Sequence, residues 1–220
     1  MEKNLVQARF TALMSQMNPH FLFNALSSIQ RYMTENDTKN ANSYLAKFSR
    51  LVRMVLENSE QGLITMEEEL KQIRSYIELE RIRFQGRFDY QVEVADSVDL
   101  IEAKVPTMMI QPFIENAIWH GLTHKKEDGL LTVKVGSQGN RVLCEIIDNG
   151  VGRKKSQEIN ARIRKGHRSI GMKNVHERIQ LINKLYKVDM EVRVEDLYEN
   201  GKIPAGTSAK VYFCPIYDEN

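Results

Sequence analysis

The sequence predicts an α+β protein, in which an N-terminal helical hairpin precedes a sandwich of a mixed sheet with helices on one face. Up to about residue 86, apolar residues recur at helical spacings of three and four. After about residue 88, runs with strand-like alternation appear between helical segments. We therefore expect helices over 1–62, a connector helix over 63–87 and the sandwich over 88–220.

The first region carries apolar stripes on both sides of Pro19 and again after the loop ENDTKN. The phase of the stripe slips by one residue at Pro19-His20, which predicts a kink, because an internal proline removes a helical hydrogen bond. Heptad spacing predicts a seam against other helices. Two helices enclose little core, so we expect a homodimer that forms a four-helix bundle. The stripes are Val6, Phe10, Leu13 and Met17; Leu22, Leu26, Ile29 and Met33; and Ala41, Leu45, Phe48, Val52 and Val55.

The connector and the second region follow from local signals. Thr65 and Glu68 predict a capping box that opens a helix ending near Gly86. Pro106 fits the first turn of a helix running to about Trp119. Strands are expected over 90–94, 131–135, 142–146, 190–194 and 209–213, with a hairpin turn near GSQGN, a short helix around 159–163 and a firmer one over 175–185.

Composition excludes several classes of function. The formal net charge of +2 is too small to favour nucleic acid or a membrane surface as a direct partner. No stretch approaches the roughly 20 apolar residues of a membrane span, and the first ten residues lack the apolar block of a signal peptide. Cys144 and Cys214 lie in apolar runs without metal-ligand spacing, which predicts free thiols in a reducing compartment.

The segment QPFIENAIWHG, residues 111–121, places Asn116 and His120 four residues apart on one helix face. An amide oxygen suits Mg²⁺, and a histidine one turn later can donate to a phosphate oxygen. The alternative is an amphipathic helix with a solvated polar face.

Three later segments add glycines and an acid. In IIDNGVG, Asp148 ends an apolar strand and Gly150 and Gly152 permit close approach of a ligand, although Asp-Asn-Gly is also ordinary turn chemistry. A basic stretch over 153–168 leads to Gly171, which stands just before the firmer helix, where backbone amides could hold phosphate oxygens. The alternative is that the basic stretch is only a solvated charged face. Gly206 and Thr207, in GTS, precede the last strand or form a simple turn.

Together, the order and spacing of these four segments resemble the GHKL ATP-binding fold of histidine kinases. The resemblance implies ATP and Mg²⁺ as cofactors, with Asn116 holding the metal, Asp148 reading adenine, and Gly150, Gly152 and Gly171 shaping the pocket. It places Gly206 and Thr207 near the base or the phosphates.

The segment QMNPHFLFNALSSI, residues 16–29, resembles the phosphoacceptor segment of LytS/YehU-type sensor histidine kinases. With the connector, the resemblance covers nearly the whole chain. At pH 7 a neutral imidazole offers a lone pair for attack on a γ-phosphoryl group, so we expect His20 to be the phosphoacceptor. A kink at Pro19 would swing the ring towards a second domain, whereas an isolated histidine is usually only packed in its helix.

The sequence departs from the family pattern at three places. Phe21 follows His20 where many histidine kinases have an acidic base; Glu115 is a candidate for that role, and Asn24 could orient the ring. Trp119 replaces the usual lysine of the Asn116 helix, so His120 or the basic stretch would have to supply the cation. Ser169 replaces a central glycine before Gly171, which predicts a differently packed lid and weaker ATP binding.

The first interpretation is therefore the cytoplasmic portion of an inner-membrane sensor kinase that phosphorylates His20 and passes the group to an aspartate of a response regulator. The resemblance implies a LytTR-type regulator and a membrane sensor region upstream of this chain, contacting the membrane only through that region. A dimeric scaffold that binds nucleotide without catalysis, and a GHKL ATPase that uses Glu115 without autokinase activity, are the alternatives.

Overall fold

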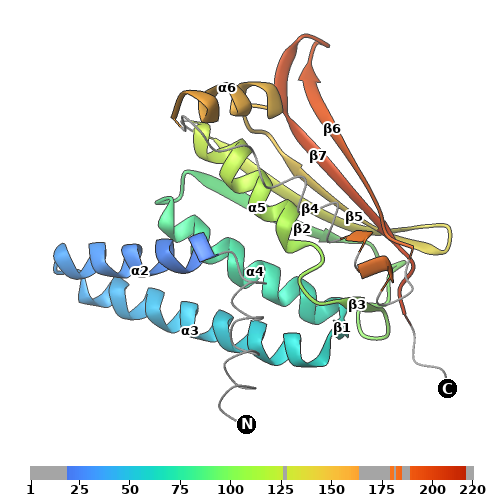
Figure 1. Cartoon of the computed structure of the whole chain (residues 1–220), viewed down its shortest axis with the longest axis horizontal. Helices are drawn as coiled ribbons and strands as arrows, with labels where there is room; N and C mark the ends of the chain where they lie inside the picture. The colour runs from blue at the N-terminus through green and yellow to red at the C-terminus, as the bar shows by residue number, and fades with distance from the viewer. Residues whose placement is uncertain (1–18, 126–127, 164–178, 181, 185–188, 217–220) are drawn as a thin grey trace.

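The computed structural model describes residues 19–125, 128–163, 179–180, 182–184 and 189–216. Its elements confirm the predicted α+β class: helices come first, and a five-stranded mixed sheet follows (Figure 1). The helices are α2 (Pro19–Thr34), α3 (Thr38–Gln61), α4 (Met66–Arg83), α5 (Gln111–Asn116) and α6 (Arg153–Ile163). The strands are β1 (Leu63–Thr65), β2 (Phe88–Val94), β3 (Lys104–Pro106), β4 (Gly129–Gln138), β5 (Arg141–Asp148), β6 (Glu191–Glu199) and β7 (Ile203–Phe213).

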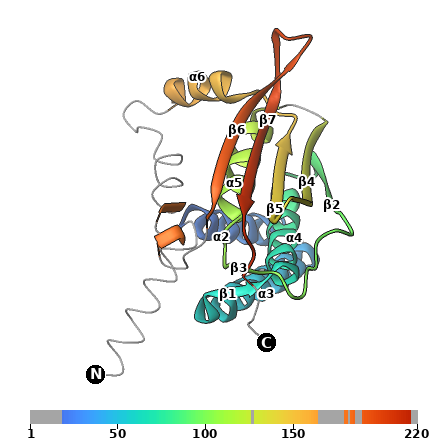
Figure 2. The same ribbon diagram turned by 90° about the vertical axis from the view of Figure 1, so that its right-hand side faces the viewer.

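The sheet has the order β2-β4-β5-β7-β6. Strand β2 is parallel to β4, and the other neighbours are antiparallel. Helices α4 and α5 lie against one face of the sheet, and the hairpin of α2 and α3 packs on the far side of α4 (Figures 1 and 2). One continuous set of buried apolar side chains runs from α2 to β7, so the connector helix is packed on both sides.

The predicted hairpin between β4 and β5 is confirmed, and it turns at Gly139, which has a positive φ of 64°. The helix predicted from Pro106 is wrong at its start. Pro106 ends strand β3, which pairs with β1, and Pro112 occupies the first turn of α5 instead. The helix predicted over 175–185 lies mostly outside the described residues, although Ile182 is buried.

Within one chain, the hairpin helices bury only part of the predicted stripes. In helix α2, the side chains of Phe21, Ala25 and Ser28 are buried, whereas Leu26 is 56% and Met33 is 66% exposed. Helix α3 buries Ala41, Tyr44, Leu51, Val55 and Asn58. Periodicity marks an apolar face without saying what covers it: within one chain α4 covers the adjacent face, and the covering of Leu26 and Met33 by a second copy stays a prediction.

The start of α4 fixes the start of α5. The predicted capping box is confirmed, since Thr65 Oγ1 accepts from the Glu68 amide at 3.2 Å and Glu68 Oε2 accepts from the Thr65 amide at 2.9 Å. One turn on, the fully buried Glu69 accepts from the backbone amides of Met108 and Ile110, each at 3.0 Å. This carboxylate holds the backbone that leads into the Asn116 helix.

We expect Glu69→Gln to lower the free energy of unfolding by about 2 kcal/mol, because the amide retains one acceptor and turns a donor towards a backbone N–H. Urea denaturation at pH 7 measures this, with Glu67→Gln, at an exposed position of the same helix turn, as the control. Equal unfolding midpoints for the two variants would contradict the role given to Glu69.

Candidate functional site

Asp148 is the buried centre of the candidate site. It ends β5, is 1% exposed and lies in register with Thr207 of β7. The amide of Gly150 donates to Asp148 Oδ1 at 2.9 Å, and Thr207 Oγ1 donates to Oδ2. Burial raises the pKa of this carboxyl above its usual value, and the hydrogen bonds from Thr207 and Gly150 oppose that rise.

Glycines from three elements meet around Asp148. A Cβ at Gly121 would overlap Asp148 Oδ1, and a Cβ at Gly150 would overlap the backbone of Gly121. Gly206 has a φ of +124°, and a Cβ there would overlap the Asp148 carbonyl oxygen. The backbone can therefore close around the carboxylate only where side chains are missing.

The sequence predicted that Gly206 and Thr207 precede the last strand. In the structure both residues lie inside that strand, β7. Strand β7 begins at Ile203, and the pairing of β6 with β7 shifts register between Leu197 and Tyr198, next to Gly206. Such an irregularity re-aims the backbone locally, while on the other side of β7 Thr207 pairs directly with Asp148 of β5. Gly152, with a φ of +77°, is buried beside Pro204.

Asn116 ends α5, and the helix then widens into a π-helical turn over Ala117–Gly121. The amide of Leu122 donates to the carbonyl of Ala117, five residues back. Glu115 and Asn116 are half-buried and His120 is exposed. This turn delivers Gly121 to Asp148, so the structure joins the Asn116 helix to the Asp148 loop; π-helical turns are frequent at functional sites.

A cation from the connector lies against Trp119. The guanidinium of Arg83 is 3.9 Å from the centroid of the Trp119 ring and 4.0 Å from that of Phe84. Arg83 also pairs with Glu80 at 2.8 Å, and Glu80 is fully buried. Trp119 therefore brings an arginine beside the helix position where the family pattern has a lysine.

The pKa of Glu80 is unusually high for a glutamate. Burial raises its pKa to about 7; Arg83 opposes the rise, and the nearby Glu115 adds to it. Glu80 and Glu115 are thus electrostatic neighbours, one on the connector and one next to Asn116.

His20 is the second residue of α2, and its side chain lies outside the described part of the structure, as does the kink predicted with residues 1–18. Phe21 is 2% exposed and packs on Tyr76, with ring centroids 5.0 Å apart, and on Phe48 at 6.0 Å. The residue that replaces the acidic base therefore anchors the start of α2 to α3 and α4.

Other predicted features are placed only in part. Gly171 and Ser169 lie outside the described residues, and the basic stretch is described only as far as 163. One turn after His20, Asn24 Nδ2 is buried without a hydrogen-bond partner among the residues that the structure describes. Both cysteines are free, Cys144 buried and Cys214 half-buried.

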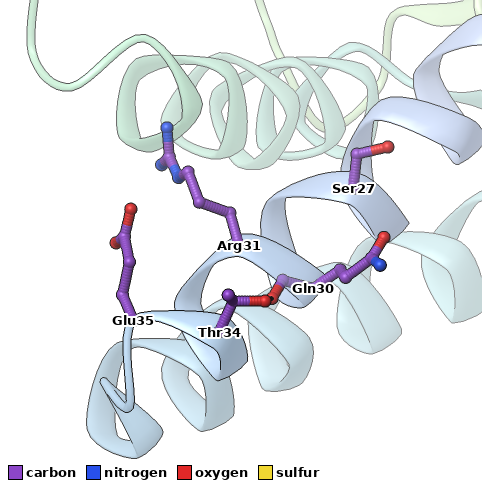
Figure 3. A pocket seen from close by; sticks show the side chains of 5 residues that line it. All are labelled: Ser27, Gln30, Arg31, Thr34 and Glu35. Atoms are coloured by element: carbon purple, nitrogen blue, oxygen red, sulfur yellow. Dashed lines mark hydrogen bonds between the residues drawn. The ribbon is translucent and has the colours of Figure 1, made fainter.

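An open groove of about 300 Å³ lies along α2, lined by Ser27, Gln30, Arg31, Thr34 and Glu35 (Figure 3). None of the predicted nucleotide-binding residues lines it, so we do not assign the groove to the nucleotide.

The residues present fit the cofactors that the sequence implied. A buried carboxylate in a cradle of glycines suits the amino edge of a base, and the amide of Asn116 beside Glu115 offers hard oxygen atoms for Mg²⁺. Within the described ranges, no group of three or more His, Cys, Asp or Glu side chains could hold a metal ion. A metal held by Asn116 would therefore rely on water and phosphate oxygens for its other ligands. No helix in the described part is long and apolar enough to span a membrane.

Sequence reasoning missed three contributors to this site. Gly121 closes the quoted segment QPFIENAIWHG, and its distance of five residues from Asn116 fits a widened turn. Arg83 and Gln72 belong to the connector, and Gln72 Nε2 donates to Oε1 of Gln111 in α5 at 3.5 Å. In the sequence, the spacing of both residues indicates only a helix surface. No local signal marks either residue, since both are placed by the packing of α4 on α5.

Several known proteins are similar to this chain. The family model described as histidine kinase matches residues 8–88. The sensor histidine kinase YpdA of Escherichia coli is 36% identical over 179 residues, covering 80% of this chain and 31% of that protein. The sensor histidine kinase/phosphatase LytS of Staphylococcus aureus is 35% identical over 156 residues, covering 70% of this chain and 26% of that protein. The chain thus spans about a third or less of the length of these relatives. A solved bacterial phosphotransferase shares the fold, with a TM-score of 0.50 and 11% identity, covering 93% of this chain and 96% of that one.

Proposed function

Since the chain belongs to the histidine kinase family and is of the LytS type, we propose that it is the transmitter module of a sensor kinase that phosphorylates its own His20 from ATP. The observation that carries the proposal is the meeting of the Asn116 helix, the Asp148 loop and β7 at one buried carboxylate.

In the proposed site, Asp148 accepts a hydrogen bond from the adenine amino group, and the glycines let the base approach the backbone. Asn116 holds Mg²⁺, which neutralises charge on the transferred phosphoryl group when it is bound. His120, exposed one turn after Asn116, donates to phosphate oxygens, together with the basic stretch and the backbone at Gly171.

The transfer makes one bond and breaks one. A ring nitrogen of His20 attacks the γ-phosphorus of ATP, the bond to the β,γ-bridging oxygen breaks, and ADP leaves. Glu115 accepts the proton that the imidazole loses, a role that Phe21 cannot fill. The phosphoryl group then passes to an aspartate of a response regulator, which we propose to be of the LytTR type.

The hairpin supports a homodimer as the working form. Apolar side chains on its outer surface remain exposed in the single chain: Phe23 at 70%, Met33 at 66%, Leu26 at 56% and Leu45 at 45%. Three of these four side chains belong to α2, and exposed large apolar side chains gathered on one element indicate an interaction surface. Leu26 and Met33 belong to the predicted seam, so a second copy completing a four-helix bundle is the partner that fits. We place this module on the cytoplasmic side of the inner membrane, attached to it through a sensor region outside this chain, with no direct contact to nucleic acid.

The experiment is incubation of the chain with γ-labelled Mg-ATP, followed by a test for acid-labile, base-stable phosphate on the protein. We expect label on the wild type and none on His20→Gln. Asn116→Asp should reduce the labelling rate at least tenfold, because it disturbs the metal site.

The other outcomes are equally clear. Free phosphate without protein label would identify an ATPase, and neither product would identify a scaffold. Full labelling of His20→Gln would remove His20 as the acceptor, and undiminished labelling of Asn116→Asp would remove that residue from the site.

A further inference from the structure

Three buried side-chain amides from three different elements form a single file that ends on Glu115. Asn58 Nδ2 donates to Gln72 Oε1 at 2.9 Å, and Gln72 Nε2 donates to Gln111 Oε1 at 3.5 Å. Gln111 Nε2 then donates to Glu115 Oε1 at 3.0 Å. The exposed fractions of Asn58, Gln72 and Gln111 are 6%, 0% and 4%. We call this file the amide relay.

All hydrogen bonds of the amide relay run in one donor-to-acceptor direction, and Glu115 determines that direction. An ionised carboxylate only accepts hydrogen bonds, so Gln111 must turn its NH₂ group towards Glu115 and its oxygen towards Gln72. Gln72 must then present its NH₂ group to Gln111 and its oxygen to Asn58. Reversing any one amide would bring two donors or two acceptors together in a buried place.

Packing alone does not require such a file. Apolar side chains of the same shape would fill the space between α3, α4 and α5 without the desolvation cost of amides. Connected hydrogen bonds in a low-dielectric interior polarise one another and fix a unique arrangement. The relay also joins α3, the second helix of the hairpin that carries His20, to the residue directly before Asn116.

We propose that Gln111 and Gln72 are positioning residues that orient the Glu115 carboxylate for proton acceptance, and that Asn58 links this orientation to helix α3. The inference rests on the proposed function, in which Glu115 is the base. Its consequence is that displacement of the C-terminal end of α3 changes the catalytic competence of the nucleotide site without changing the nucleotide contacts.

The test compares Gln111→Met, Gln72→Met and Asn58→Leu, which keep approximate shape and remove the amide. We expect the kcat of autophosphorylation to fall about tenfold in Gln111→Met and about threefold in Gln72→Met, with a smaller fall in Asn58→Leu. The KM for ATP should stay within about twofold of the wild-type value, because none of the three is assigned to nucleotide binding. Gln61→Met, at an exposed glutamine of α3, is the matched control and should leave both constants unchanged.

A double-mutant cycle separates positioning from general damage. In the Glu115→Gln background, Gln111→Met should reduce kcat no further, since the group that it orients is already lost. An equal loss in both backgrounds, a change in KM alone, or an unchanged kcat in Gln111→Met would overturn the proposal. If circular dichroism shows that Gln111→Met does not fold, the same double-mutant cycle is measured with Gln72→Met instead. That variant is the milder change, because the hydrogen bond between Gln111 and Glu115 can still form.

Failure of the relay and failure of the proposed function give different results. Label that persists in His20→Gln removes the kinase assignment itself. Label confined to wild-type His20, with a wild-type kcat in Glu115→Gln, keeps the kinase and removes both the base and the relay that orients it.

Discussion

Gly121→Ala is expected to weaken binding of Mg-ATP about 30-fold while the sheet remains folded. The φ at Gly121 is −94°, so alanine is not strained by the backbone. Its Cβ would instead overlap Asp148 Oδ1 and lie 2.8 Å from Cγ, forcing the carboxylate away from the Gly150 amide. The displaced carboxylate can no longer accept from the base, and a hydrogen bond to a charged group is worth about 2 kcal/mol, which corresponds to the stated loss of affinity.

Isothermal titration calorimetry with a non-hydrolysable ATP analogue and Mg²⁺ measures this directly. The matched control is Gly136→Ala in β4, where a Cβ would meet only Ala95 Cβ at 3.9 Å, an ordinary contact. We expect wild-type affinity for this control. Wild-type affinity in Gly121→Ala as well would mean that Asp148 does not read the nucleotide.

Between pH 5 and pH 8, the free energy of unfolding of the wild type should fall by about 3 kcal/mol relative to that of Glu80→Gln. The pKa of Glu80 is about 7 in the folded protein and 4.5 without the fold, chiefly because of burial. Between these values the unfolded chain has lost the proton and the folded chain retains it, so stability falls as pH rises. Each pH unit in that window costs about 1.4 kcal/mol, and the loss is complete above the folded pKa.

The glutamine variant does not titrate, so the free energy of unfolding of wild type minus that of Glu80→Gln should decrease over this interval. Urea denaturation at pH 5 and pH 8 gives both values. Tyr44, whose pKa burial raises to about 12, stays neutral throughout and does not contribute. A parallel series with Glu57→Gln, at an exposed position of α3, should run parallel to wild type. A constant difference between wild type and Glu80→Gln would show that the carboxyl does not titrate in this window.

The same acid lies close to the candidate base, since Glu115 contributes to the raised pKa of Glu80. Arg83 compensates part of this charge and stacks on Trp119 and Phe84. The replacement of lysine by Trp119 is therefore accompanied by an arginine from the connector.

The sequence by itself determined the elements whose signals are local. The capping box at Thr65 and Glu68, the turn at Gly139 and the apolar alternation of β4 and β5 each depend on residues a few positions apart, and the structure confirms them. The order of the predicted nucleotide-binding segments was also readable, because each segment combines a helix or strand end with small residues. That order identified the family before any geometry was known.

Only the tertiary structure decided which faces are covered and which side chains meet. None of Phe21, Glu69, Gln72 and Glu80 belongs to a predicted apolar stripe, yet all four are buried in the folded chain. Gly121 is needed because β5 and β7 bring Asp148 against it, 27 residues away in sequence. Short-range periodicity specifies a helix or strand, whereas burial and hydrogen bonding across elements depend on how those elements pack, which no local pattern contains.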